Sequence, residues 1–264
     1  PMKINNLEEQ EVNDIIEKEN IDLSSFRIKE TLNPKIFDRE QQMYKEIRKR
    51  LLMIADDFFE TLDIGYVEIS DIILTGSLAN FNWSRFSDVD LHILLDFGDV
   101  DENEELVRSY FNSKKNLWNE KHNITVKGYD VELYVQDQDE PHVASGVYSV
   151  LWDKWNVKPE RENFQIDNKK VKEKANSLID TIKHFFELYK GGDYDKLIRS
   201  IKTLKEKIKK MRQTGLDREG EYSYENITFK VLRRMEFLDK LSELETLAYD
   251  KSLTLDESIQ FIRN

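Results

Sequence analysis

IILTGSLANFNWSRFSDVDLH, residues 72–92, is the stretch that decides the fold we expect. An apolar run ends in Gly76-Ser77, a polar turn follows, and a second apolar run contains Asp88 and Asp90. Both runs predict strands, because aliphatic and β-branched residues favour the interior of a sheet. Side chains two residues apart on a strand point to the same face, so the two aspartates should form a carboxylate pair.

A third carboxylate occurs on a later predicted strand. Residues 130–136 alternate, which places Val131 on one face and both Asp130 and Glu132 on the other. Carboxylates gathered on one face cost free energy unless cations neutralise them. In a chain without cysteine, these oxygen ligands favour Mg²⁺ and allow Mn²⁺, held partly by the phosphates of a substrate.

The turn at Gly76-Ser77 supplies the complementary chemistry. Glycine lets the backbone come close to a phosphate. The residues after Ser77 could begin a helix whose free N–H groups bind anions. Carboxylates for metal ions beside a phosphate cradle indicate phosphoryl or nucleotidyl transfer.

This pattern resembles the DNA polymerase beta-like nucleotidyltransferase superfamily. The resemblance rests on Gly76-Ser77, ten intervening residues, Asp88-Val89-Asp90 and the later Glu132 between apolar neighbours. The sequence of Ser87–Leu91, Ser-Asp-Val-Asp-Leu, is typical of small prokaryotic and phage members of this superfamily. The resemblance covers about residues 40–157 and implies a mixed β-sheet with flanking helices.

The resemblance also implies a two-metal mechanism. Asp88 and Asp90 would bridge two Mg²⁺ ions, and Glu132 would bind the catalytic ion and help deprotonate an acceptor hydroxyl. Many members have an aspartate as third carboxylate, so Asp130 is the alternative to Glu132. His92 continues the alternation on the same face, where we expect it to be a hydrogen-bonded structural residue rather than a ligand.

The nucleotide ligands follow from the same resemblance. Gly76, Ser77 and the nearby backbone amides would hold the terminal phosphates of a nucleoside triphosphate, and Ser87 could add a hydrogen bond. A nucleoside monophosphate would then pass to the acceptor with release of pyrophosphate. The acceptor stays open between a small molecule, a protein side chain and an RNA.

The rest of the chain predicts an α+β protein with a C-terminal helical bundle. We expect an N-terminal helical or extended arm at 1–37, a nucleotidyltransferase domain at 38–160 and a helical domain at 161–264. The expected elements are helices at 38–63, 105–121, 168–190, 193–213, 223–247 and 254–263, and strands at 66–75, 87–95, 124–127, 130–136 and 143–157.

Charge also divides the chain, close to the boundary expected between the two domains. Residues 1–167 hold 19 Lys and Arg against 35 Asp and Glu, whereas residues 168–264 hold 21 against 17. The basic residues are concentrated at 196–212, which could be a solvated helix face or could contact triphosphate or RNA phosphates. No apolar run reaches the roughly 18 residues of a membrane span, so we expect a cytoplasmic protein without a membrane partner.

Two other functions remain compatible with this pattern. One is a non-catalytic nucleotidyltransferase-like protein that binds a nucleotide or a partner. The other is a toxin or defence-type transferase that modifies RNA or protein. The retained carboxylates favour an enzyme, because a protein that only binds has no need for three of them.

Overall fold

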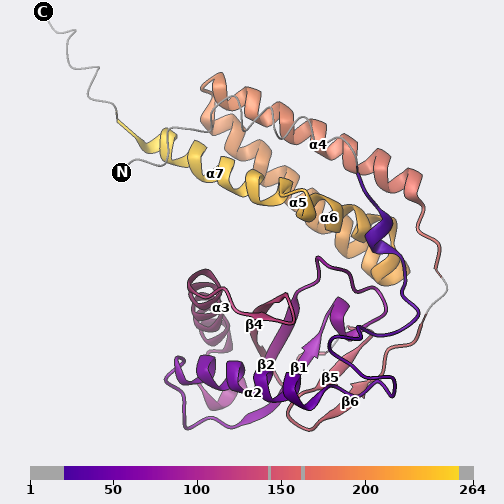
Figure 1. Ribbon diagram of the computed structural model, residues 1–264. Helices are drawn as coiled ribbons and strands as arrows, with labels where there is room; N and C mark the ends of the chain where they lie inside the picture. The colour runs from indigo at the N-terminus through magenta and orange to yellow at the C-terminus, as the bar shows by residue number, and fades with distance from the viewer. Residues whose placement is uncertain (1–20, 142–143, 162–163, 256–264) are drawn as a thin grey trace, which may run out of the picture. The chain divides into compact units, whose positions relative to one another are not determined.

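A computed structural model describes residues 21–141, 144–161 and 164–255, and confirms the α+β class (Figure 1). Its helices are α2 (Lys45–Glu60), α3 (Glu104–Lys121), α4 (Asn168–Lys190), α5 (Tyr194–Glu219), α6 (Tyr224–Arg234) and α7 (Phe237–Leu253). Its strands are β1 (Ile69–Thr75), β2 (Val89–Leu95), β3 (Thr125–Val126), β4 (Tyr129–Asp137), β5 (Val147–Ser149) and β6 (Lys154–Val157). The chain divides into two compact units, one at Ser25–Asn163 and the other formed mainly by the chain from Phe164 onward.

The strands of the first unit form one mixed sheet in the order β3-β4-β2-β1-β5-β6. The predicted strand pair around residues 72–92 is confirmed, since β1 and β2 pair antiparallel. The central strand β2 pairs parallel with β4, because α3 carries the chain back between them. The expected single strand region at 143–157 is instead two short antiparallel strands, β5 and β6, joined by a turn in which Asp153 has a φ of 55°.

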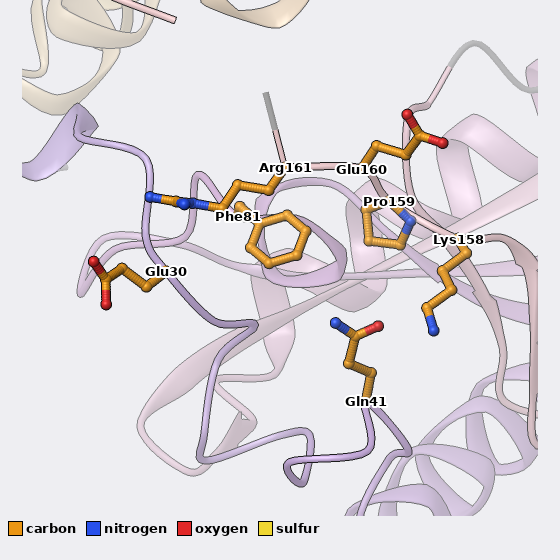
Figure 2. A pocket seen from close by; sticks show the side chains of 7 residues that line it. All are labelled: Glu30, Gln41, Phe81, Lys158, Pro159, Glu160 and Arg161. Carbon is orange, nitrogen blue, oxygen red and sulfur yellow. The ribbon is translucent and has the colours of Figure 1, made fainter. Parts of the chain in front are cut away.

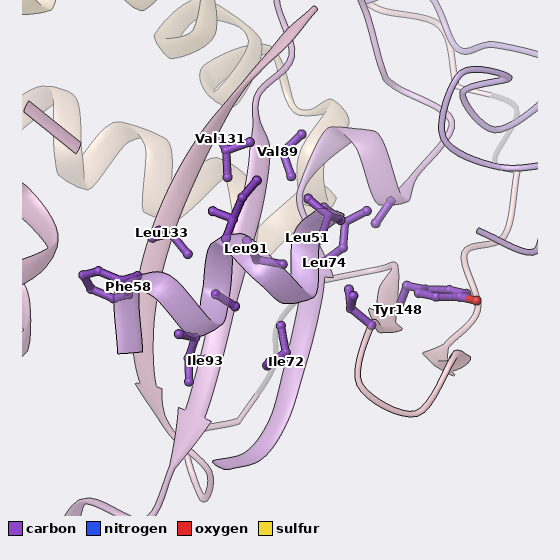
Figure 3. Close-up of a cluster of buried hydrophobic side chains, with 14 of the residues drawn as sticks. Leu51, Phe58, Ile72, Leu74, Val89, Leu91, Ile93, Val131, Leu133 and Tyr148 are labelled. Atoms are coloured by element: carbon purple, nitrogen blue, oxygen red, sulfur yellow. The ribbon is translucent and has the colours of Figure 1, made fainter. Parts of the chain in front are cut away.

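One face of this sheet is the core of the first unit. Val89 and Leu91 of β2 are buried on that face, and Leu133 of β4 lies beside them (Figure 3). Leu51 and Phe58 of α2 pack in the same cluster. Burying each such side chain contributes about 1.5–3 kcal/mol, so this face holds the strand register.

Helix α2 starts later than the sequence predicts, at Lys45 rather than at residue 38. The Asp38 carboxylate accepts the backbone N–H groups of Glu40 and Gln42, both at 2.9 Å, and this turn competes with the helix. Gln41 has a φ of 65°, which an α-helix does not allow.

The second unit contains α4, α5, α6 and α7, and each of these helices contacts the other three. The expected helix 168–190 is confirmed in full, and Gly191 follows it. The helix expected at 193–213 extends further, to Glu219. None of the described helices is both long and apolar enough to span a membrane.

The expected continuous helix 223–247 is wrong. Ser223 caps α6 as expected, but the helix is interrupted at Met235 and Glu236, where Glu236 has a left-handed φ of 62°. In one continuous helix Phe237 would face away from the stripe that contains Val231, since 3.6 residues make a turn. The break turns Phe237 into the core, where it is 2% exposed. Residues 256–263 of the short helix expected at 254–263, and residues 1–20 of the arm expected at 1–37, lie outside the described residues.

Candidate active site

The face of the sheet opposite the main core carries the carboxylates that the sequence singles out. Asp90 of β2 is the register partner of Glu132 of β4, so both side chains leave the same face of adjacent parallel strands. Both are partly exposed, while Val89, Leu91, Val131 and Leu133 are buried on the opposite face. The predicted alternation is therefore confirmed, and two of the three candidate carboxylates are direct neighbours.

Asp90 also lies against the backbone of the Gly76 turn. On β1, Thr75 is the register partner of Asp90. A Cβ built on Gly76 would meet Oδ2 of Asp90 at 1.9 Å, so only glycine leaves room for the carboxylate. Gly76 further adopts φ 73° and ψ −160°, a region that is essentially restricted to glycine. The conformation of the turn thus brings backbone and carboxylate together.

The two candidate serines hold this loop closed. The Ser77 hydroxyl donates to Oγ of Ser87 at 2.7 Å, and that oxygen also accepts the backbone N–H of Ser84 at 2.9 Å. Ser87 is 6% exposed, whereas Ser77 is partly open to solvent. Ser77 therefore stands where it could meet a phosphate, and Ser87 mainly fixes the loop.

The α-helix expected after Ser77 does not form. The structure has only one 3₁₀ turn, η2 (Ser77–Ala79), and Asn80 after it is extended. The Asn80 side chain donates to Oγ of Ser145, and its own oxygen accepts the N–H of Phe81. These bonds satisfy the loop without a helix, so no helix dipole supports anion binding here.

A polar network beyond Asp90 positions Glu132. The Tyr134 hydroxyl donates to Oε2 of Glu132, and the Tyr134 ring stacks on His92 with centroids 4.7 Å apart. His92 places Nε2 3.2 Å from Oγ1 of Thr75 and Nδ1 3.1 Å from Oε1 of Gln136. Both ring nitrogens therefore have protein partners, which is the structural role expected for His92 rather than that of a metal ligand. The alternation already placed Tyr134 beside Glu132, but no sequence signal identified their contact.

The fit to metal ions is partial. Carboxylate oxygens suit Mg²⁺, and Asp90 and Glu132 are adjacent, with Asp88 one residue before β2. Among the residues that the structure describes, however, no group of three His, Cys, Asp or Glu side chains is arranged to hold a metal ion. Asp130, the alternative third carboxylate, is exposed on the same face and pairs with Thr125 at the sheet edge.

The basic residues at 196–212 lie on α5 in the second unit. Its exposed cations are Lys196, Arg199, Lys202, Lys207, Lys209 and Lys210. Lys205 instead pairs with Glu245 of α7 at 2.6 Å. On α6, burial lowers the pKa of Lys230, Glu221 opposes this shift, and the nearby Arg233 reinforces it. Binding of phosphate or RNA by this surface stays a prediction.

Comparisons with known proteins provide little information about the function of this chain. No family model matches the chain, and no curated protein matches it. Among solved structures, it is similar to the STING-associated CdnE c-di-GMP synthase from Capnocytophaga granulosa, with 16% identity over 81% of this chain and 84% of that chain. The TM-score of this pair is 0.21, too low to support an argument about fold or function.

Proposed function

We propose that this protein is a Mg²⁺-dependent nucleotidyltransferase that transfers a nucleoside monophosphate from a nucleoside triphosphate to an acceptor hydroxyl. One observation carries the proposal: the register places Asp90 beside Glu132, and Gly76 brings the backbone of its turn against the same carboxylate. A solvated pair of surface acids would not require a glycine with no room for a Cβ. The combination is what phosphoryl-transfer chemistry needs, a carboxylate pair beside a closely approaching backbone.

Each residue has a distinct role in this proposal. Asp88, Asp90 and Glu132 would hold two Mg²⁺ ions, which supply charge stabilisation for the transferred phosphoryl group when bound. Ser77 and the Gly76 backbone would orient the terminal phosphates. The Tyr134 hydroxyl fixes the carboxylate of Glu132, so that its orientation does not depend on the substrate.

Calorimetry with ATP, GTP, CTP and UTP in the presence of Mg²⁺ tests which nucleoside triphosphate binds to the protein. Incubation of the protein with each labelled nucleotide and a host lysate then identifies the acceptor. Asp90→Asn should abolish Mg²⁺-dependent labelling while the melting temperature is unchanged. Asp56→Asn, at an exposed position of α2, is the matched control and should label normally. A folded wild-type protein that binds none of the four nucleotides contradicts the proposal.

Two further variants assign the third carboxylate. Glu132→Gln should remove labelling, whereas Asp130→Asn should retain it, because only Glu132 pairs with Asp90. The reverse result would leave the reaction class intact and move the ligand to Asp130.

A protein that binds nucleotide without catalysis is the second candidate. The observation in its favour is that no group of three ligands is formed among the described residues. It predicts that a nucleoside triphosphate binds but that no molecule in a lysate becomes labelled.

A further inference from the structure

A pocket of about 510 Å³ lies in the first unit (Figure 2). It is lined by Glu30, Gln41, Phe81, Lys158, Pro159, Glu160 and Arg161. The volume falls within the range of small-molecule sites, about 300–1,000 Å³. None of these residues belongs to the proposed carboxylate and phosphate site.

Hydrogen bonds between distant segments hold the walls in place. The Lys29 N–H donates to the Phe81 carbonyl at 2.7 Å, and Nε of Arg161 donates to the Lys29 carbonyl at 3.1 Å. Nε1 of Trp155 donates to the Gln41 carbonyl at 2.7 Å. Three parts of the chain are thus fixed around one space, which reduces the ordering cost of binding a ligand.

Gln41 is the most informative residue of this pocket. Its Oε1 is buried and has no hydrogen-bond partner. Its backbone has a φ of 65°, which is unfavourable for a residue with a side chain. A buried unpaired acceptor costs stability, and a ligand that donates a hydrogen bond to the Gln41 amide would offset that cost.

The charges of the pocket add an anion-binding group. Lys158 is exposed, and it forms no ion pair among the residues that the structure describes. Figure 2 shows the Gln41 amide and the Lys158 ammonium turned toward the same space, whereas the Glu160 carboxylate points away from it. Phe81 and Pro159, both buried, supply apolar surface beside them.

We infer that this pocket binds a mononucleotide, with the Gln41 amide on the hydrogen-bonding edge of the base and Lys158 on the phosphate. A primary amide offers a donor and an acceptor side by side, which complements the paired acceptor and donor of a base edge. Phe81 gives the planar base an apolar contact, and a lysine is a common partner of phosphate. Because the phosphate meets a cation directly, binding needs no Mg²⁺ and does not rest on the proposed transferase function.

Calorimetry in EDTA tests the inference with AMP, GMP, CMP and UMP, and with adenosine and ribose 5-phosphate as fragments. At least one mononucleotide should bind about tenfold more tightly than either fragment, since it uses both Gln41 and Lys158. No binding by any mononucleotide overturns the inference. Equal affinity for ribose 5-phosphate also overturns it, because the pocket would then recognise phosphate alone.

Gln41→Gly is the decisive variant. Glycine removes the amide and accepts the left-handed φ, so the affinity should fall at least about tenfold while the melting temperature stays equal or rises. Asp63→Gly is the matched control, since Asp63 has a φ of 55° at an exposed turn outside the pocket. It should leave affinity unchanged. Unchanged affinity in Gln41→Gly overturns the inference.

A second pair of variants tests the phosphate contact. Lys158→Gln should weaken binding of the mononucleotide and leave adenosine unaffected. Lys154→Gln, at an exposed position of β6 outside the pocket, should change neither. Asp90→Asn should also bind normally in EDTA, so a failure of the transferase proposal is distinguishable from a failure of this one.

Discussion

Gly76→Ala perturbs the turn against which Asp90 lies, and its cost can be worked from two terms. The first is conformational, because φ 73° and ψ −160° are essentially accessible to glycine alone, at about 1–3 kcal/mol for another residue. The second is steric. The new Cβ would lie 1.9 Å from Oδ2 of Asp90, so the carboxylate must move by about 1.5 Å to reach ordinary contact.

Forcing such a shift in a packed site costs about 1–3 kcal/mol. The two terms together predict that Gly76→Ala lowers the free energy of unfolding by about 2–6 kcal/mol. If Asp90 holds a metal ion, Mg²⁺-dependent nucleotide binding should weaken as well, because the displaced carboxylate is a ligand.

Matched glycines separate the two terms. Gly220 has nearly the same backbone, φ 71° and ψ −156°, and a Cβ there would meet nothing within 4 Å. Gly128, in the same unit as Gly76, has φ 84° and is equally open. Alanine at either position should cost only the conformational term, about 1–3 kcal/mol.

Urea unfolding provides the assay. All four tryptophans lie between residues 83 and 155, so their fluorescence reports the first unit, while circular dichroism follows the helical unit that contains Gly220. Gly76→Ala should lower the free energy of unfolding by about 1–3 kcal/mol more than Gly128→Ala, and the double variant Gly76→Ala/Asp90→Ala should lack this extra loss. An equal loss in Gly76→Ala and Gly128→Ala would refute the close packing of Asp90 on the turn.

Two further predictions concern buried hydroxyl groups. Ser87→Ala should lower the free energy of unfolding by about 1–3 kcal/mol in urea, and Ser77→Ala by less, because only Ser87 accepts the buried N–H of Ser84. Burial, reinforced by the hydrogen bond to Asp153, raises the pKa of Tyr148 to about 12. A raised folded-state pKa stabilises the protein below pH 10 and this contribution is lost as the pH rises toward 12. Between pH 9 and 11, wild-type stability in urea should therefore fall more than that of Tyr148→Phe, and parallel curves would contradict this.

The sequence predicts most of the sheet because alternation and burial agree there. Val89, Leu91 and Val131 could not face water without exposing an apolar stripe, so the opposite face was left to Asp90 and Glu132. Register follows from the same constraint, since a slip by one residue would bury the carboxylates.

Local hydrogen bonds explain two of the differences between the structure and the sequence prediction. The Asp38 carboxylate stops α2 from starting early, and Asn80 ends the turn after Ser77 before a helix can form. The break at Glu236 contains no glycine or proline that would have predicted it, and it accompanies the burial of Phe237. The pocket around Gln41 was equally hidden, because its walls come from segments far apart in the chain.

Alternation and strand pairing together distinguish the two candidates for the third carboxylate. Alternation alone leaves Asp130 and Glu132 equivalent, since both lie on the same face of β4. Pairing separates them: Glu132 stands beside Asp90, while Asp130 faces Thr125 at the edge of the sheet. The Tyr134 hydroxyl then fixes Glu132 from its own strand. Of the two acids, Glu132 is the one whose register partner on β2 is Asp90 and whose carboxylate accepts a hydrogen bond from a tyrosine hydroxyl, so it is the better positioned candidate.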